Sequence, residues 1–379
     1  MHVAGRSLLG AADVSDDVLA DMVAAQLHVP SVQVLSATAD VAPYDLEALT
    51  TAGRYRLRGL AAHASGEETF DFYVKVVQSW ERSPAFQFVP PEVREIALAG
   101  IPWRREPDVY RSDLAQRLPE GLRMPAAHGV FEVDELSAAI WLEVIEVAED
   151  GWHIERFRRA AYLLGRLAGS REVMPLGSLG GVGSVPRMYA FGRLDHQVLP
   201  ALRSDDVWDH PLVTATFDDK LRKDLLSAAD ALPGYLDELD RVPLGTLHGD
   251  ACTRNLLVPA QDDGGFVVID FGFWGRGPVG FDLTQLLMGE VQMGERPAKE
   301  LPDLEAVCLP AYRQGLLEEG VVIDDGLLRR AHALLMLEFA GLSAVPLEHL
   351  DGPPTPDTLR IAAERAASAR FILDLVAAA

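Results

Sequence analysis

The sequence predicts an α+β protein in which a small antiparallel β-sheet lobe is followed by a mainly helical lobe. Segments rich in β-branched and aromatic residues lie before residue 148, and apolar residues recur at helical spacing after it. The length of 379 residues also exceeds what one small core organises. We therefore expect two domains, an N-terminal lobe at residues 1–148 and a C-terminal lobe at residues 149–379.

The composition is that of a folded, acidic protein. Hydrophobic residues make up 49% of the chain, and 34 basic against 57 acidic residues give a net charge of -23. This charge disfavours binding to nucleic acid or to an anionic membrane, and it suits a substrate that carries positive charge. The two cysteines form no disulfide framework, which fits a cytoplasmic protein. No apolar run has the length of a membrane span.

The N-terminal lobe is predicted to contain one packing helix and a sheet. Residues 15–27 place apolar side chains at helical spacing behind Ser15, a residue type that favours helix N-caps. Strand patterns follow this helix, and the pattern FDFYVKVVQ is the strongest of them. The strands are expected at residues 32–37, 55–62, 70–78 and 139–147.

The strongest strand carries Lys75 between two valines. A lysine inside a strand usually extends from a sheet edge. A lysine that binds a ligand instead needs an acidic partner from the following helix, which fixes the orientation of its ammonium group. Glu95 and Glu106 are the two candidates, and we favour Glu106 because its segment leads directly into the next strands. Pro107 is unusual there, since a residue before proline avoids helical geometry unless it lies in the first turn.

The second part of the chain is predicted to be helical, with an acidic, irregular stretch that contains Asp205 and Asp219. These acids either line a pocket for an amine-bearing substrate or form a solvated surface. A glycine-rich segment at residues 177–183 and a proline-rich loop at residues 351–357 separate helices. Helices are expected at residues 152–169, 221–239, 283–287, 304–317, 326–342 and 358–377.

The most specific pattern lies between Leu247 and Leu286, LHGDACTRNLLVPAQDDGGFVVIDFGFWGRGPVGFDLTQL. His248-Gly249-Asp250 is followed by Asn255, and an apolar strand then ends at Asp270-Phe271-Gly272. Either triplet alone is common, but the two in this order and at this spacing are specific. Carboxylate and amide oxygens are ligands that Mg²⁺ prefers when it also binds phosphate oxygens. The pattern therefore predicts a metal-dependent phosphoryl-transfer site.

With these motifs the chain resembles the aminoglycoside phosphotransferase family of protein-kinase-like enzymes, from Lys75 to about residue 287. The resemblance implies a bilobal kinase-like fold and a co-substrate, ATP or GTP, with Mg²⁺. It also implies that Asp250 is the catalytic base and that Asn255 and Asp270 bind magnesium. By the same resemblance, Lys75 holds the nucleotide phosphates and Glu106 orients it.

Three features depart from the family pattern or leave a nucleotide contact open. No glycine-rich G-x-G-x-x-G loop lies between the first two strands, so Thr50 and Thr51 or backbone amides remain candidates for phosphate contact. Phe271 stands where many antibiotic kinases carry tryptophan. The strand at residues 139–147 would present backbone groups near Glu143 and Ile145 to the adenine ring, although an ordinary buried strand has the same sequence.

The motif favours a small-molecule acceptor over a protein. Only eleven residues separate Asp270 from Asp282, and Gly249 replaces the arginine that protein kinases carry there. We therefore expect phosphorylation of a hydroxyl group on an antibiotic, aminoglycoside-like or otherwise sugar-containing, in resistance or self-protection. The alternatives are a metabolic kinase of a sugar or amino alcohol and a nucleotide-binding pseudokinase scaffold. Asp282 is expected to hold the catalytic loop in place.

Overall fold

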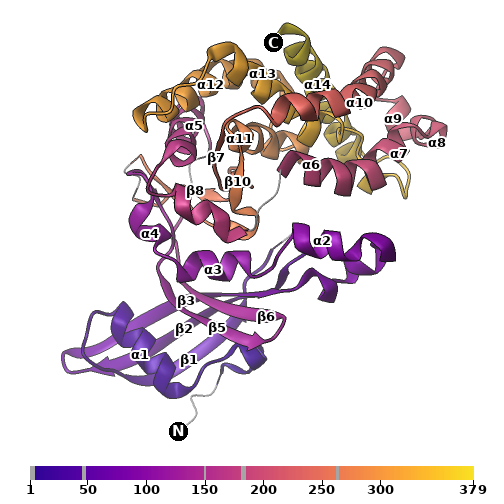
Figure 1. Ribbon diagram of the computed structural model, residues 1–379. Helices are drawn as coiled ribbons and strands as arrows, with labels where there is room; N and C mark the ends of the chain where they lie inside the picture. Colours follow the sequence, from indigo (N-terminus) through magenta and orange to yellow (C-terminus); the bar gives the residue numbers. More distant parts are fainter. Residues whose placement is uncertain (1–4, 45–47, 149–150, 181–184, 262–263) are drawn as a thin grey trace. The chain divides into compact units, whose positions relative to one another are not determined.

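The computed structural model describes residues 5–44, 48–148, 151–180, 185–261 and 264–379. The chain divides into two compact units (Figure 1). The first consists of Met1–Gln116, Arg123–Val147 and Val267–Gly272, and the second of Arg117–Leu122, Ala148–Phe266 and Phe273–Ala379. The predicted α+β class, with an antiparallel sheet first and helices after it, is confirmed.

The first unit is built on a five-stranded antiparallel sheet of order β1-β2-β3-β6-β5. It has more strands than the sequence patterns indicated, because residues 127–134 also join it as β5. The register pairs Lys75 on β3 with Arg54 on β2 and with Ile140 on β6. The strands are β1 (Gln33–Val41), β2 (Thr51–His63), β3 (Gly66–Gln78), β5 (Ala127–Asp134) and β6 (Ser137–Glu143).

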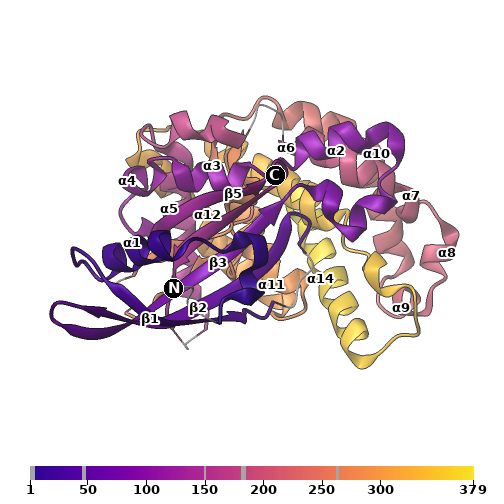
Figure 2. The same ribbon diagram turned by 90° about the horizontal axis from the view of Figure 1, so that it is seen from below.

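One face of this sheet is covered by α1 (Asp16–Gln26), which lies across the strands in Figure 2. Its N-cap is Ser15, whose side chain accepts from the backbone N–H of Val18, as predicted. Phe70, Phe72 and Val74, which alternate along β3, belong to the apolar core under this helix. Because successive side chains on a strand alternate between faces, the next residue, Lys75, points to the opposite face.

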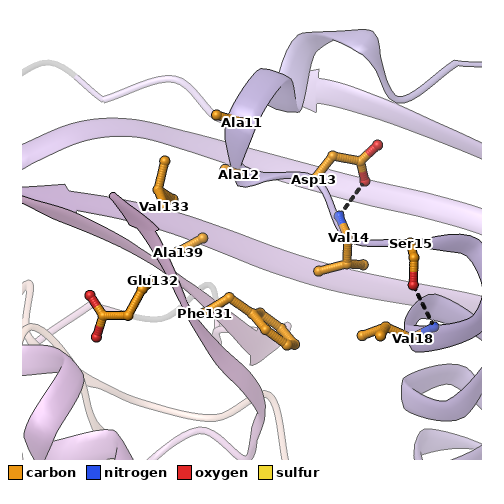
Figure 3. A pocket seen from close by; sticks show the side chains of 10 residues that line it. All are labelled: Ala11, Ala12, Asp13, Val14, Ser15, Val18, Phe131, Glu132, Val133 and Ala139. Atoms are coloured by element: carbon orange, nitrogen blue, oxygen red, sulfur yellow. Dashed lines mark hydrogen bonds between the residues drawn. The ribbon is translucent and has the colours of Figure 1, made fainter. Parts of the chain in front are cut away.

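The α1 face also has a small pocket of about 190 Å³ beside a 3₁₀ turn at Ser7–Ala12 (Figure 3). Val18, Phe131 and Val133 contribute apolar side chains to the pocket and also pack against the core under α1. The pocket therefore lies on the face of the sheet that Lys75 does not face. None of the candidate site residues lines it.

The strand β3 is followed by short helices that complete the first unit. The segment of 3₁₀ turns and α2 (Arg94–Gly100) has no buried residue, whereas α3 (Arg105–Arg111) buries most of its length. In α3, Pro107 occupies the first turn, where its missing N–H leaves no hydrogen bond unmade. A further turn, α4 (Leu114–Arg117), and the two-residue strand β4 (Leu122–Arg123) follow.

The second unit is mainly helical, and two of its helices, α5 and α12, pack against each other at glycines. Gly165 on α5 and Gly315 on α12 have no side chains, and a Cβ atom at either would lie 2.0 Å and 2.1 Å from a carbonyl oxygen of the facing helix. These helices therefore pack backbone to backbone. Its principal helices are α5 (Ile154–Gly169), α10 (Asp219–Leu239), α11 (Phe281–Gln292), α12 (Leu301–Glu318), α13 (Asp325–Met336) and α14 (Pro356–Ala378).

The stretch between α5 and α10 differs from the irregular segment that the sequence indicated. It forms short helices and a π-helical segment at Ala190–Val198, and a second π-helical segment at Leu337–Gly341 continues α13. Acidic residues at helix starts account for part of this difference, because they are favourable beside the N-terminus. The short helices are α6 (Val185–Tyr189), α7 (Leu199–Leu202), α8 (Asp205–Trp208) and α9 (Pro211–Thr214).

Several predicted features lie outside the described residues. They include residues 45–47 of the candidate phosphate-covering loop, part of the glycine-rich segment, the end of the apolar run at 149–150 and the turn at 262–263. Among the residues that the structure describes, no helix has both the length and the apolarity to cross a membrane. The remaining strands are β7 (Leu244–Leu247), β8 (Leu256–Leu257), β9 (Phe266–Val268) and β10 (Gly275–Pro278).

Candidate active site

Lys75 is buried in the first unit between two carboxylates. Its Nζ lies 2.7 Å from Oε2 of Glu106 and 3.1 Å from Oδ1 of Asp270, and only 5% of the residue is exposed. Burial lowers the pKa of Lys75, but the charges of Asp270 and Glu106 outweigh this and raise it. The lysine is therefore a cation that two acids hold in one orientation.

Glu106 reaches Lys75 from α3. It is 3% exposed, and burial raises its pKa to about 7 against the opposing effect of the Lys75 charge. Glu95, the other acid considered, is exposed on α2. Of the two, Glu106 is thus the residue that pairs with Lys75.

Asp270 begins the Asp-Phe-Gly triplet after β9 and has an unusual backbone. Its φ of 63° lies in the left-handed region, which non-glycine residues seldom adopt and which is common where a side chain must be aimed. The next side chain, Phe271, is fully buried and contacts the ring of Tyr110 edge to face, with centroids 5.5 Å apart. The backbone oxygen of Gly272 accepts a hydrogen bond from the Arg105 guanidinium at 3.2 Å.

The loop that contains Asp250 is held in the second unit by Asp282. The carboxylate of Asp282 accepts hydrogen bonds from the backbone N–H groups of His248 and Gly249, both at 2.8 Å. His248 is buried, and its Nδ1 accepts from the backbone N–H of Asp250 at 3.3 Å. Asp282 lies in the first turn of α11, and its two oxygens close the loop, as the sequence analysis expected of this residue.

Asp282 is itself buried, with 1% exposure. Burial raises its pKa to about 7, and the two backbone donors act in the opposite direction. The helix that positions it starts at Gly280, where φ is 98° and where the backbone N–H donates to the hydroxyl of Tyr312 at 2.9 Å. Tyr312 therefore connects α12 to the start of α11.

Asn255 and Asp250 are joined directly. The side-chain nitrogen of Asn255 donates to the backbone oxygen of Asp250 and to its Oδ2, both at 2.9 Å. Since the nitrogen is used in these contacts, the amide oxygen points away from them and is the atom suited to a metal ion. Gly249 permits the tight loop, because its φ is 87° and a Cβ atom there would lie 2.1 Å from the Phe273 carbonyl oxygen.

The two residues expected near adenine lie at the end of β6. The backbone N–H of Glu143 donates to the Ala126 oxygen at 2.9 Å, and its carboxylate accepts from Arg123 and from the Ala126 N–H. The N–H of Glu143 is therefore used within the first unit. Ile145 is half-buried and follows the strand.

The residue types fit magnesium bound with phosphate oxygens better than a metal held by protein alone. In the described ranges no three His, Cys, Asp or Glu side chains gather as a metal cluster. Magnesium commonly binds through one or two protein ligands plus phosphate oxygens. Asp270, in the first unit, and Asn255, in the second, supply oxygens of the required kind.

Some residues of the site were not found by sequence reasoning. Arg105 and Tyr110 contact the Asp270-Phe271-Gly272 segment although they lie far from it in sequence. Tyr312 is another, because its hydroxyl contact with Gly280 joins two helices. No local pattern marks such contacts, although the spacing of Arg105, Glu106 and Tyr110 would place them close together once α3 is known.

Residues 155–317 match the model of the phosphotransferase enzyme family. No curated protein matches the sequence significantly.

Similar solved structures include an aminoglycoside phosphotransferase from Alicyclobacillus acidocaldarius subsp. acidocaldarius, at 15% identity over 89% of this chain and 96% of that one, with a TM-score of 0.47. A Plasmodium vivax ethanolamine kinase has 12% identity over 89% and 83% of the two chains and a TM-score of 0.47. An amicoumacin kinase in complex with AMP-PNP, Ca²⁺ and Ami has 14% identity over 87% and 90%, with a TM-score of 0.40.

The matched residues 155–317 include the loop with Asp250 and Asn255 and the triplet that starts at Asp270. The predicted resemblance is therefore confirmed, and with it the prediction of an enzyme that transfers phosphoryl groups. Residues 155–317 are thus similar to the phosphotransferase enzyme family.

Proposed function

We propose that this enzyme transfers the γ-phosphoryl group of ATP or GTP to a hydroxyl group of a small molecule, with a sugar-containing antibiotic as the preferred class of acceptor. The observation that carries the proposal is the Asp250 carboxylate, which Asn255 holds inside a loop closed by Asp282. An oriented carboxylate of this kind suits a group that receives a proton from an alcohol. The net charge of -23 supports an acceptor that carries amines.

The reaction assigns one role to Asp250. The acceptor oxygen forms a bond to the γ-phosphorus while the bond from that phosphorus to the β–γ bridging oxygen breaks. Asp250 accepts the proton of the acceptor hydroxyl, and the nucleoside diphosphate leaves. Because Asn255 donates to Oδ2 of Asp250, the carboxylate keeps its direction during this step.

The nucleotide is assigned to the N-terminal lobe, residues 1–148. Lys75 would bind the α and β phosphates, and Glu106 keeps its ammonium group in place. Ile145 and the carbonyl end of Glu143 are the proposed contacts for the adenine edge. The C-terminal lobe, residues 149–379, would supply the acceptor pocket and the catalytic loop.

Magnesium would bind through Asp270 and the amide oxygen of Asn255. When bound, the ion would neutralise negative charge on the phosphate oxygens. Asp270 also contacts Lys75 at 3.1 Å, so a change at either residue is expected to alter how phosphate and metal are held.

The test measures nucleoside diphosphate release with Mg²⁺ and ATP or GTP, against aminoglycosides, macrolides, nucleoside antibiotics, simple sugars and amino alcohols. Mass spectrometry of the acceptor identifies the phosphorylated product. We expect at least one antibiotic to be phosphorylated, and we expect Asp250→Asn to lose about 10³-fold in kcat. Asp351→Asn, an exposed acid in the same unit, serves as the matched control.

Three outcomes would contradict parts of the proposal. Preference for a sugar or an amino alcohol over every antibiotic would indicate a metabolic kinase. Nucleotide binding without phosphorylation of any acceptor would favour a scaffold. Full activity of Asp250→Asn would exclude Asp250 as the proton acceptor. Drug sensitivity of a host with and without the gene then separates resistance from metabolism.

A further inference from the structure

One short helix, α3, contacts Phe271 and Gly272 of the Asp-Phe-Gly segment directly, and its Glu106 reaches Asp270 through Lys75 on β3. Glu106 holds Lys75, which in turn lies 3.1 Å from Asp270. Tyr110 packs its ring edge to face on Phe271. Arg105 donates to the backbone oxygen of Gly272 at 3.2 Å. Through these contacts α3 restrains the Asp270 carboxylate, the Phe271 ring and the Gly272 carbonyl group.

The backbone of Asp270 requires such support. Its φ of 63° is unfavourable for a residue with a side chain, and such a conformation persists only where surrounding contacts determine it. The direction of the Asp270 carboxylate depends on this conformation. Arg105 contacts the carbonyl end of the segment, two residues beyond Asp270.

An arginine at position 105 has a desolvation cost, in free energy, that a nonpolar residue of the same length would avoid. Arg105 is half-buried, and this burial lowers the pKa of its guanidinium to about 10. The group still carries its proton at neutral pH. A methionine would fill similar space without this cost, but it could not donate to the Gly272 oxygen. The hydrogen bond to Gly272 is one contact that the arginine provides and methionine does not.

We propose that Arg105 is a positioning residue that orients Asp270 for the metal–nucleotide complex by holding the Gly272 carbonyl. This inference rests on the proposed function, since it takes Asp270 as a magnesium ligand. Groups that orient a metal ligand typically change metal affinity by 10-fold to 100-fold when removed. Loss of the Arg105 contact should therefore reduce the nucleotide affinity that magnesium adds. It should change the nucleotide affinity measured without magnesium much less.

The test compares the affinity for AMP-PNP in Mg²⁺ and in EDTA, measured by calorimetry on the full chain. Arg105→Met should reduce the affinity gained from magnesium by about 10-fold and leave binding in EDTA within about 2-fold of the original. Arg105→Lys, which keeps a donor, should recover part of the gain. Arg111→Met is the matched control, because Arg111 is exposed on the same helix and pairs with Glu132 at 2.8 Å.

The outcomes separate this inference from the proposed function. If the unaltered protein gains no nucleotide affinity from magnesium, the proposed metal site is wrong. If it gains affinity and a folded Arg105→Met variant gains as much, the role of Arg105 is wrong. Should Arg105→Met fail to fold, Arg105→Leu, which also lacks a donor, replaces it, and an unchanged magnesium gain in that variant also overturns the inference. Equal losses in Mg²⁺ and EDTA would indicate a purely structural role and overturn it as well.

Discussion

The side-chain amide of Asn255 donates to both the backbone oxygen and the Oδ2 atom of Asp250, at 2.9 Å in each case. One residue thus fixes the backbone and the carboxylate of another five positions earlier in the chain. The contact makes Asn255 responsible for the direction of Asp250, in addition to its proposed role as a metal ligand. Removal of the amide should therefore affect the proton acceptor even in the absence of metal.

We expect Asn255→Ala to lower kcat by about 10²-fold to 10³-fold, because a positioned base contributes roughly that much to phosphoryl transfer. The KM for the acceptor should change little, since Asn255 is not proposed to contact it. Steady-state kinetics with saturating Mg²⁺ provides the measurement. A variant that retains more than a tenth of the original kcat would show that Asp250 is oriented without Asn255.

Lys75→Met should strongly destabilise the first unit. The substitution leaves the carboxyl groups of Glu106 and Asp270 without their cation, and breaking a buried pair in this way costs roughly 3–5 kcal/mol. Urea unfolding measures the change, and Lys75→Met/Glu106→Leu should recover part of it. Arg56→Met, which breaks a half-exposed pair with Asp71, is the control and should cost about 1 kcal/mol or less. Equal effects of the two single variants would argue against a stabilising buried pair between Lys75 and Glu106.

Gly249→Ala should impair activity and stability together. The position has a φ of 87°, and a Cβ atom would lie 2.1 Å from the Phe273 carbonyl oxygen, so the loop that carries Asp250 must move. We expect a loss of at least about 2 kcal/mol in unfolding free energy and more than about 10²-fold in kcat. Gly234→Ala has open space in α10 and should be neutral or stabilising by up to about 1 kcal/mol. Thermal unfolding and turnover measurements on both variants test this prediction.

The pH dependence of stability should reflect Glu338. This side chain is 1% exposed, neither of its oxygens has a hydrogen-bond partner among the described residues, and burial raises its pKa from 4.5 to about 8. Between these two values the folded protein holds a proton that the unfolded chain has released. The effect of Glu338 on the free energy of unfolding is therefore most favourable below pH 4.5. It lowers that free energy by up to about 5 kcal/mol as the pH rises to 8.

Glu338→Gln should make the decline between pH 4.5 and 8 less steep, as measured by urea unfolding at a series of pH values. His332 provides the opposite control, because it is buried and its pKa is lowered from 6.5 to about 4. Its contribution is complete above pH 6.5 and is lost as pH falls to 4. A decline above pH 5 that is equally steep in Glu338→Gln would mean that another group is responsible.

Much of the fold followed from local patterns. The apolar and β-branched pattern around Lys75 predicted a strand, and the structure places β3 there. Ser15 and the spacing behind it predicted α1 to within a residue of its ends. Such signals work because capping and side-chain alternation act over a few residues. The resemblance in the catalytic loop is specific for a similar reason, since its residues lie close together in sequence.

What could not be predicted depends on contacts between distant segments. No repeating pattern in the sequence marks such contacts. Examples are the register that pairs Lys75 with Ile140, the donation from Arg105 to Gly272 and the hydroxyl contact of Tyr312 with Gly280. The short helices after α5 were also missed, because several are single turns stabilised by packing rather than by propensity.

The glycines that bring α5 and α12 together have a consequence for chimeric enzymes. Because Gly165 and Gly315 allow no side chain between the helices, the spacing is set by two backbones and cannot be adjusted by a rotamer change. This spacing also sets the position of the Tyr312 hydroxyl, which accepts from Gly280 at the start of α11. Asp282 lies two residues after Gly280. Exchange of α12 alone with that of a related protein would shift the anchor of the catalytic loop, so a working graft must transfer both helices as one block.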